Sequence, residues 1–441
     1  MKALELKYKD SCRVSDQELT DYGKRCKPEI ARIQSALTQG YESDYASLNV
    51  VTDEISLEIV HNVIADKKAL NPTMLIVIGI GGSNLGAMAV HEAINGTFYN
   101  ESDPATKVYW ADSVDIIHIQ TIASFMEQAL KKGENVILNV ISKSGATTET
   151  IAVYQILLEL LKKYKHDDAH RYVVVTTDKE SKLWKLAQKE ECVLLEIPKK
   201  VGGRYSVFCP VGLFPLGMLD IDTTQLVKGA RSVIPEYTDE DIFNNPALLS
   251  AAVLAVHYQQ GKYIHDTFVF STQLESFGKW YRQLMGESIG KEFNRQGEQV
   301  HVGITPTVSV GSVDLHSVGQ LYLAGPNNRC TTFVSVRNFS SLAYSVVPQM
   351  QGYELLVENI AGKSLPTIQH AILQGVQAAY KKRLLPYLSV SISDISAFSI
   401  GQLLQCKMLE IMYLGYMLDV NPFDQPNVEL YKQETREILK V

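Results

Sequence analysis

The sequence predicts an α/β fold made of two tandem domains, each a mainly parallel sheet with helices on both faces. Two observations support this prediction. Short apolar runs rich in branched residues alternate with helical patterns between residues 74 and 197, and the same alternation resumes from residue 245. Strands of a sheet that helices cover on both faces are apolar along their whole length, as these runs are.

The first half contains the clearest alternation. Residues 15–70 read as amphipathic helices that Asp16 and Glu18 open and Asn71-Pro72 stops, so we expect residues 1–70 to be a helical segment packed on the core. Strands are predicted at 74–78, 107–110, 135–141, 172–176 and 192–197, with helices between them, notably at 84–95 and 148–163. These elements form a first α/β domain over residues 71–225.

The second half repeats the pattern less regularly. Strands are predicted at 267–270 and 331–336, and helices at 245–260, 274–289, 365–385 and 394–419. Pro235 and the acidic stretch Glu236–Asp241 indicate a boundary near 215–240. We therefore expect a second α/β domain over residues 226–441, with a C-terminal helical extension.

Composition excludes several classes of protein. The chain has 441 residues, 46% hydrophobic and 21% charged, which is typical of globular domains. A net charge of -7 and the lack of a basic run with aromatics argue against a nucleic-acid partner. No secretory signal and no long uncharged apolar stretch is seen, so we expect no membrane partner. Six scattered cysteines without a C-x-x-C pair predict reduced thiols in a cytoplasmic protein, with no metal site.

A glycine-rich loop, Gly79–Gly86, follows the first strand and precedes a helix. Glycines let a ligand approach the backbone, and a helix N-terminus offers free N–H groups to an anion. The loop lacks the dinucleotide fingerprint, because Asn84 stands where glycine is needed, and it lacks the Walker A lysine, because Ala87 follows Gly86. A nucleotide is not supported, and an ordinary tight turn remains the alternative.

A second loop, Ser142–Thr150, also follows an apolar strand and opens a helix. It holds five small hydroxyl residues around Gly145, with Lys143 among them. A helix N-cap needs one hydroxyl, whereas a phosphate monoester accepts many hydrogen bonds. We therefore predict a phosphate site here, with a decorated N-cap as the alternative.

A carboxylate supplies the candidate chemistry. Gln283 and Glu287 are four residues apart and share a helix face, and Gly286 adjoins the carboxylate. Such a glutamate can act as a base, or it can be a surface residue paired with Lys291. Arg204 directly follows two glycines, which suits a guanidinium that faces an anion.

Together these segments resemble the glucose-6-phosphate isomerase family. The resemblance rests on five motifs in order, with His316 between the last two: Gly79–Gly86, Ser142–Thr150, Gly202–Pro210, Gln283 with Gly286–Lys291, and Asp424–Lys432. It covers the chain from about residue 70. It implies two sugar-isomerase (SIS) domains, a homodimer, and reversible isomerisation of glucose 6-phosphate and fructose 6-phosphate through ring opening and a cis-enediol, in glycolysis and gluconeogenesis. It implies no metal and no organic cofactor.

The resemblance also implies roles for single residues. Glu287 is the base that moves a proton between C2 and C1, and Arg204 is the cation near the enediol oxygen. His316, from the neighbouring subunit, and Lys432 assist ring opening. The remaining site residues bind the sugar phosphate: Gly82, Ser83, Ser142, Lys143, Ser144, Thr147, Gln283 and Gln425. Two departures are Ala146, where a hydroxyl residue is usual, and Tyr431, where many members have glycine.

Three other functions fit the pattern less well. A sugar-phosphate sensor on the same domains would not need Glu287, His316, Arg204 and Lys432 together, and would usually carry a DNA-binding module. The amidotransferase that makes glucosamine 6-phosphate needs an N-terminal cysteine, whereas this chain begins Met1-Lys2-Ala3. A nicotinamide dehydrogenase is disfavoured by the failed glycine fingerprint.

Overall fold

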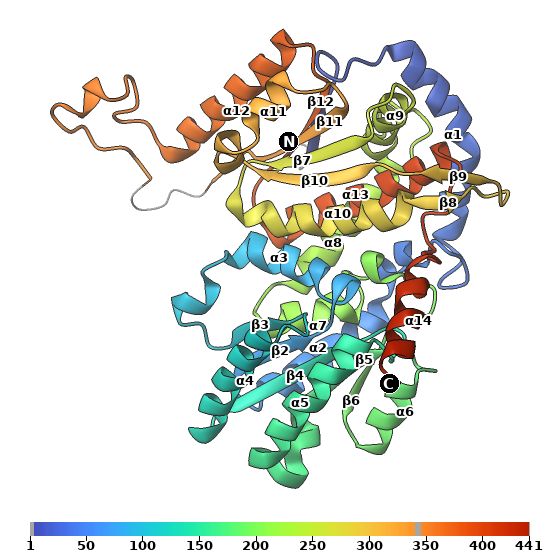
Figure 1. The fold of residues 1–441 in the computed structure, drawn as a ribbon, viewed down its shortest axis with the longest axis vertical. Coiled ribbons are helices and arrows are strands. Elements are labelled where there is room, and N and C mark those ends of the chain that lie inside the picture. The colour runs from blue at the N-terminus through green and yellow to red at the C-terminus, as the bar shows by residue number, and fades with distance from the viewer. Residues whose placement is uncertain (1–3, 340–344, 441) are drawn as a thin grey trace.

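Two α/β layers make up the protein, one above the other in Figure 1. The computed structural model describes residues 4–339 and 345–440. Each layer contains a five-stranded sheet, with strand orders β3-β2-β4-β5-β6 and β1-β12-β11-β7-β10. This confirms the predicted fold class.

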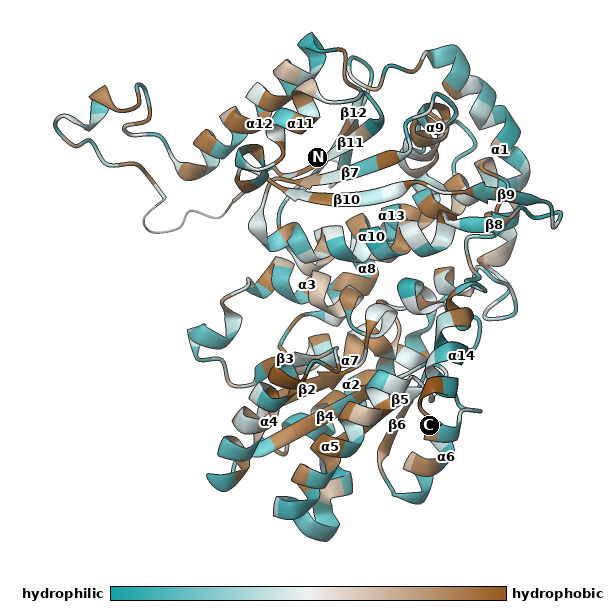
Figure 2. Cartoon of the chain, in the orientation of Figure 1, coloured by the Kyte–Doolittle hydropathy of each residue, from teal (hydrophilic) through white to brown (hydrophobic). Residues whose placement is uncertain are grey.

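The first sheet is parallel throughout. Its strands, all predicted, are β2 (Pro72–Ile78), β3 (Lys107–Ala111), β4 (Asn135–Ile141), β5 (Val173–Thr177) and β6 (Val193–Glu196). Alternate residues of β2 enter different cores: Leu75 and Val77 join the large central core, while Ile76 and Ile78 join the outer one. Burial on both faces explains why β2 is hydrophobic along most of its length, and why β4 is hydrophobic apart from its two asparagines (Figure 2).

Helices cover both faces of this sheet. They are α2 (Glu54–Lys68), α3 (Leu85–Asn95), α4 (Ile116–Lys131), α5 (Thr148–Lys165), α6 (Lys182–Lys189) and α7 (Pro210–Met218). The outer core lies between the sheet and α4, α5 and α6, through Ile122, Leu157 and Leu183 among others. On the other face, α2 packs on α7.

The second sheet holds four parallel strands and one antiparallel edge strand. They are β7 (Ile264–Val269), β10 (Thr305–Val310), β11 (Arg329–Val336), β12 (Tyr387–Ile392) and the antiparallel β1 (Leu4–Lys7). A small hairpin, β8 (Lys291–Phe293) with β9 (Gln299–Val302), follows the helix that carries the candidate base. The helices of this half are α8 (Thr223–Tyr237), α9 (Pro246–Gln259), α10 (Glu275–Ile289), α11 (Gly319–Ala324), α12 (Leu365–Lys382), α13 (Ala397–Met417) and α14 (Val428–Ile438).

Three strands of this sheet were not predicted. β10 reads Thr-Pro-Thr-Val-Ser-Val, is paler than β2 in Figure 2, and occupies the edge, where a proline costs no ladder bond. β12 lies in the short interval between two predicted helices. β1 is four residues long and pairs with Ser389–Ile392, almost the whole chain away. Residues 4–7 of the expected N-terminal helical segment therefore form a strand of the second sheet.

Most of the remaining N-terminal segment is helical, in α1 (Asp16–Ala36) and α2, with turns at residues 8–15 and 37–45. Ser15 caps α1, and Glu18 completes a capping box with it. α1 packs on α9 and α13, whereas α2 packs on the first layer. Pro235, expected at a break, lies inside α8, which ends two residues later. The expected boundary between residues 225 and 226 falls within that helix.

Within the described ranges, 4–339 and 345–440, no helix has the length and apolar character needed to cross a membrane. The same ranges contain no group of three His, Cys, Asp or Glu residues arranged to hold a metal ion.

Candidate active site

The glycine loop after β2 meets a second glycine-containing turn. Gly81–Ser83 form a short 3₁₀ turn, η3, and Ser83 is half-buried there. A Cβ atom on Gly82 would lie 2.3 Å from the carbonyl carbon of Gly203. Gly81 has φ +61°, and a Cβ there would lie 2.9 Å from the side-chain nitrogen of Gln283. Glycine is therefore required here so that three segments distant in sequence can touch.

The Ser/Thr loop after β4 is built around the N-terminus of α5. Thr147 is the N-cap residue, but its side chain makes no capping hydrogen bond. Its hydroxyl instead lies 2.9 Å from that of Ser142. Ser144 is exposed, and its Oγ accepts from the Ala146 N–H at 3.3 Å. The first amides of α5 thus have no side-chain cap, as a site for an anion requires.

Lys143 supplies positive charge to this loop. It is half-buried, and burial lowers the pKa of its ammonium. Within the described part of the chain its ammonium has no hydrogen-bond partner. The structure thus brings Ser142, Lys143, Ser144 and Thr147 together at one helix end, as predicted from their spacing.

Arg204 joins three parts of the chain. It lies in the 3₁₀ turn η6 (Gly203–Tyr205) and is 2% exposed. Its Nε donates to Ser288 Oγ at 2.7 Å, and one terminal nitrogen donates to the carbonyls of Pro422 and Asp424, at 2.6 and 3.0 Å. Its other terminal nitrogen donates to Gln425 Oε1 at 2.7 Å. This second nitrogen is the one that faces Glu287.

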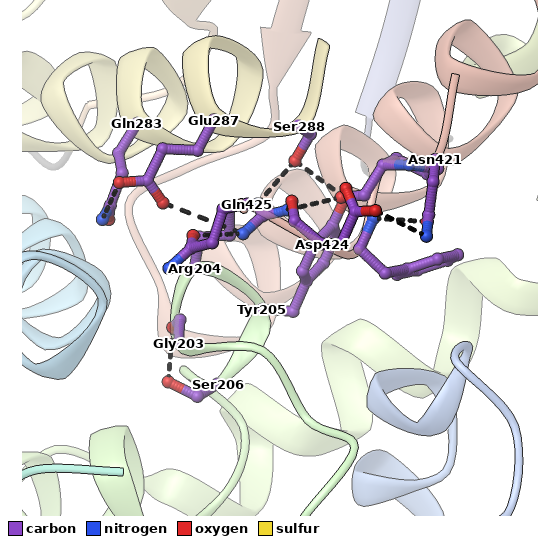
Figure 3. Close-up of polar contacts among 12 residues, drawn as sticks. Gly203, Arg204, Tyr205, Ser206, Gln283, Glu287, Ser288, Asn421, Asp424 and Gln425 are labelled. Carbon is purple, nitrogen blue, oxygen red and sulfur yellow. Dashed lines mark hydrogen bonds and ion pairs between the residues drawn. The ribbon is translucent and has the colours of Figure 1, made fainter. Parts of the chain in front are cut away.

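Glu287 lies in the last turn before the end of α10. Figure 3 shows its side chain extending toward Arg204, with Gln283 beside it on the same helix. Glu287 Oε2 is 3.8 Å from Arg204, and Oε1 accepts from Gln283 Nε2 at 3.3 Å. The carboxylate is about one-third exposed. Gln283 Oε1 is buried and has no hydrogen-bond partner among the described residues, so it is free to accept from a ligand hydroxyl.

The alternative role for Glu287, a surface pair with Lys291, is wrong. The Lys291 ammonium bonds the backbone carbonyl of Glu287 at 2.9 Å and the carboxylate of Asp424 at 3.0 Å. No hydrogen bond or ion pair joins this ammonium to the Glu287 carboxylate, although the negative charge of Glu287 still raises the pKa of the lysine. The expected i, i+4 contact exists only through the backbone.

Sequence reasoning missed two residues of this network. Ser288 is fully buried, and its hydroxyl lies 3.1 Å from Tyr205 Oη as well as accepting from Arg204. The Tyr205 hydroxyl also donates to the Pro422 carbonyl at 3.3 Å. Their positions directly after Glu287 and Arg204 are the one signal that could have identified them.

Two predicted site residues lie outside this cluster. His316 ends the 3₁₀ turn η8 (Val313–His316) and is exposed, and its side chain forms no hydrogen bond within the described ranges. Lys432 lies on α14 and pairs with Glu429 at 2.6 Å. The structure therefore gathers Glu287, Arg204, Gln283 and Gln425, but leaves His316 and Lys432 apart from them.

Comparison with known proteins decides the family. A model of the family described as "Phosphoglucose isomerase" matches residues 65–441. The chain belongs to the phosphoglucose isomerase family. The resemblance found in the sequence is thereby confirmed.

Relatives within the phosphoglucose isomerase family cover most of the chain. A glucose-6-phosphate isomerase of Carboxydothermus hydrogenoformans is 35% identical over 369 residues, 82% of this chain and 78% of that protein. A probable glucose-6-phosphate isomerase of Methanococcus maripaludis is 33% identical over 368 residues, 83% and 78% of the two chains.

Solved structures agree with the fold. A crystal structure of a hypothetical protein from Thermus thermophilus matches with a TM-score of 0.85 at 28% identity, covering 99% of both chains. A glucose-6-phosphate isomerase from Chlamydia trachomatis shares the fold, with a TM-score of 0.82 at 19% identity, covering all of this chain and 89% of that one.

Proposed function

We propose that this chain catalyses the reversible isomerisation of glucose 6-phosphate and fructose 6-phosphate, with Glu287 as the base. Membership of the phosphoglucose isomerase family supports the reaction. The observation that carries the residue assignment is the setting of Glu287, whose carboxylate faces Arg204 and Gln283 at the junction of three loops. We also propose an N-terminal helical segment, 1–70, and two α/β domains, 71–225 and 226–441, each built around one sheet, with α8 crossing the boundary between them.

The phosphate of the substrate would bind at the N-terminus of α5. Ser142, Ser144 and Thr147 offer hydroxyls there, the α5 amides offer N–H groups, and Lys143 offers charge. This contact is remote from the reacting carbons, so its binding energy can position the sugar. Gly82 and Ser83 complete the sugar site from the first loop.

Glu287 would act once the ring is open. Its carboxylate takes the proton from C2 of the aldose, the C1=C2 bond forms, and the C1 carbonyl oxygen gains a proton, giving the cis-enediol. The same carboxyl group then protonates C1 while O2 loses its proton and becomes the ketone. The terminal nitrogen of Arg204 that faces Glu287 would stabilise negative charge on the enediol oxygen. Gln283 and Gln425 would orient the sugar.

His316 and Lys432 would assist ring opening, with His316 supplied by a second copy of the chain. The parallel strands β7 and β10 end side by side, with Val269 opposite Val310. Because α10 follows β7 and η8 follows β10, η8 lies at the same end of the sheet as the start of α10. Glu287 lies more than three turns further along that helix, about 18 Å from its start. The site is incomplete within one chain, which supports a homodimer.

A long arm supports the same assembly. Residues 345–364, between β11 and α12, reach away from the body in Figure 1. Leu355 and Leu356 in this arm are 85% and 75% exposed, and Tyr353 is 59% exposed. Apolar side chains on a protruding segment need a covering surface, which a second copy can supply.

A mixing experiment tests the shared site. Glu287→Gln and His316→Ala homodimers are expected to be inactive, but a mixed dimer keeps one site with both native residues. Random reassociation should restore about one quarter of wild-type activity, because half of the dimers are mixed. A mixture as inactive as its parents would contradict the shared site.

We further propose that the enzyme works in the cytoplasm. All six cysteines are free and buried, as expected in a reducing compartment. A coupled assay that converts fructose 6-phosphate to glucose 6-phosphate tests the activity directly, and no turnover would contradict the function.

A further inference from the structure

Lys291 makes three polar contacts at the end of the helix that carries Glu287. It opens β8, two residues after α10 ends, and its side chain is 6% exposed. The ammonium contacts the carbonyl of Glu287, the carbonyl of Asp424 and the carboxylate of Asp424. A lysine ammonium has three N–H donors, so its donors match these three oxygens in number.

The position of this ammonium suits a cation. α10 ends at Ile289, and the last turn of a helix presents carbonyls without partners of their own and negative partial charge. Burial lowers the pKa of Lys291, while the Asp424 carboxylate opposes that shift. If a buried cation loses one of its partners, its charge is no longer fully compensated. The arrangement of the groups around it is then destabilised.

The same contacts connect Lys291 to the substrate-facing groups. The Asp424 carbonyl accepts from both Lys291 and Arg204. The next residue, Gln425, accepts from the Arg204 nitrogen that faces Glu287. A closed ring of contacts therefore runs from the Glu287 backbone through Lys291, Asp424 and Arg204 back to the Glu287 carboxylate.

A second link from β8 reaches the same loop. Glu292 follows Lys291, and its carboxylate accepts from the Asn427 side chain at 2.7 Å. Two adjacent residues of β8 thus contact the loop before α14: Lys291 binds Asp424, and Glu292 binds Asn427. None of the residues of α14 is buried, so its placement depends on this loop.

We propose that Lys291 is a positioning residue: it fastens the C-terminal loop 421–427, with Gln425 and the start of the helix that bears Lys432, to the end of the helix that bears Glu287. The inference rests on the proposed function, because it concerns the alignment of the groups assigned there. Lys291 itself does not touch the reacting carbons. Its effect should fall on turnover rather than on binding of the phosphate, which α5 holds.

The central variant is Lys291→Met, which keeps the length of the side chain and removes the three donors. We expect kcat to fall on the order of 10²-fold, because small misplacement of reacting groups has effects of that size. KM should change less than about twofold, since the phosphate loop is untouched. Amide exchange in residues 421–432 should accelerate, while exchange in residues 142–150 should not change.

The matched control is Lys279→Met. Lys279 lies on the same helix and pairs with Glu275 at 2.8 Å, with both side chains more than 40% exposed. The Lys279→Met substitution makes the same change in charge without touching the loop 421–427, so wild-type kcat is expected. If Lys291→Met fails to fold, Asp424→Ala removes one of the three acceptors and should give a smaller fall in kcat at unchanged KM.

A double variant separates positioning from general loss of structure. Gln425→Ala removes the loop residue that meets Arg204. If Lys291 acts through the loop, the combined Lys291→Met and Gln425→Ala variant should lose less activity than the product of the two single losses. Multiplicative losses, or a Lys291→Met enzyme with wild-type kcat and unchanged exchange, would overturn the proposal. Inactive wild-type enzyme would instead contradict the proposed function itself.

Discussion

Ser288→Ala tests whether the Arg204 guanidinium is held as the structure indicates. The Ser288 hydroxyl accepts from Arg204 Nε at 2.7 Å in a fully buried setting. The substitution removes this acceptor and leaves a buried N–H of a charged group without a partner. The Tyr205 hydroxyl loses the same neighbour, since it lies 3.1 Å from the Ser288 hydroxyl.

The magnitude follows from the loss of the hydrogen bond to Arg204, the stronger of the two contacts of this hydroxyl because its donor is charged. A hydrogen bond to a charged group contributes about 1.5–3 kcal/mol, so the free energy of unfolding should fall by about 2 kcal/mol. Arg204 would also lose one of the contacts that fix its orientation toward Glu287. We expect kcat/KM to fall about tenfold, since each factor of ten corresponds to about 1.4 kcal/mol.

Urea unfolding followed by tryptophan fluorescence measures the first quantity, and the coupled isomerase assay measures the second. Ser250→Ala is the matched control, because Ser250 is 2% exposed and its hydroxyl has no hydrogen-bond partner in the described part of the chain. Its unfolding free energy should change by less than about 0.5 kcal/mol. Equal effects of the two substitutions would refute the role of the Ser288 hydroxyl.

Three further predictions concern the loops and the core. Ser144→Ala should weaken binding of phosphorylated sugars more than of neutral sugars, as measured by calorimetry; equal weakening would argue against the phosphate loop. Gly82→Ala should lower kcat on the order of 10²-fold, because its Cβ would lie 2.3 Å from Gly203 and push two loops apart; Gly319→Ala, with no atom nearby, should be unaffected. Burial lowers the pKa of His91 from 6.5 to about 4, so its neutral form is favoured in the folded state. Its contribution to stability is therefore complete above about pH 6.5 and is lost as the pH falls toward 4, by up to about 3 kcal/mol. Urea unfolding of wild type and His91→Gln at pH 7 and pH 4.5 checks this, and an equal pH dependence in both would count against it.

The sequence predicts the strands that are buried on both faces, because such strands are continuously apolar. The edge strand β10 escapes prediction because it contains Pro306 and hydroxyl residues, and β1 escapes because its pairing partner is remote. These strands depend on tertiary contacts rather than on a local pattern.

The candidate site also contains residues that a local pattern predicts and residues that only tertiary contacts reveal. The loops at Gly82 and Ser142 have local signatures, namely glycines and hydroxyls at the end of a strand. The Arg204 network does not, because its acceptors include the backbone carbonyls of Pro422 and Asp424, which no side-chain pattern marks. His316 could be named from resemblance alone, since no local pattern marks it and the structure places it on an exposed turn apart from Glu287.

Glu287 is the residue that we propose transfers the proton between C2 and C1. Glu287→Gln keeps the shape of the side chain and removes its ability to act as a base. The direct measurement is fructose 6-phosphate turnover by this variant, together with its affinity for the sugar phosphate. We expect retained affinity and a loss of kcat of about 10²-fold or more. Turnover at the wild-type rate would contradict the role of Glu287 as the base.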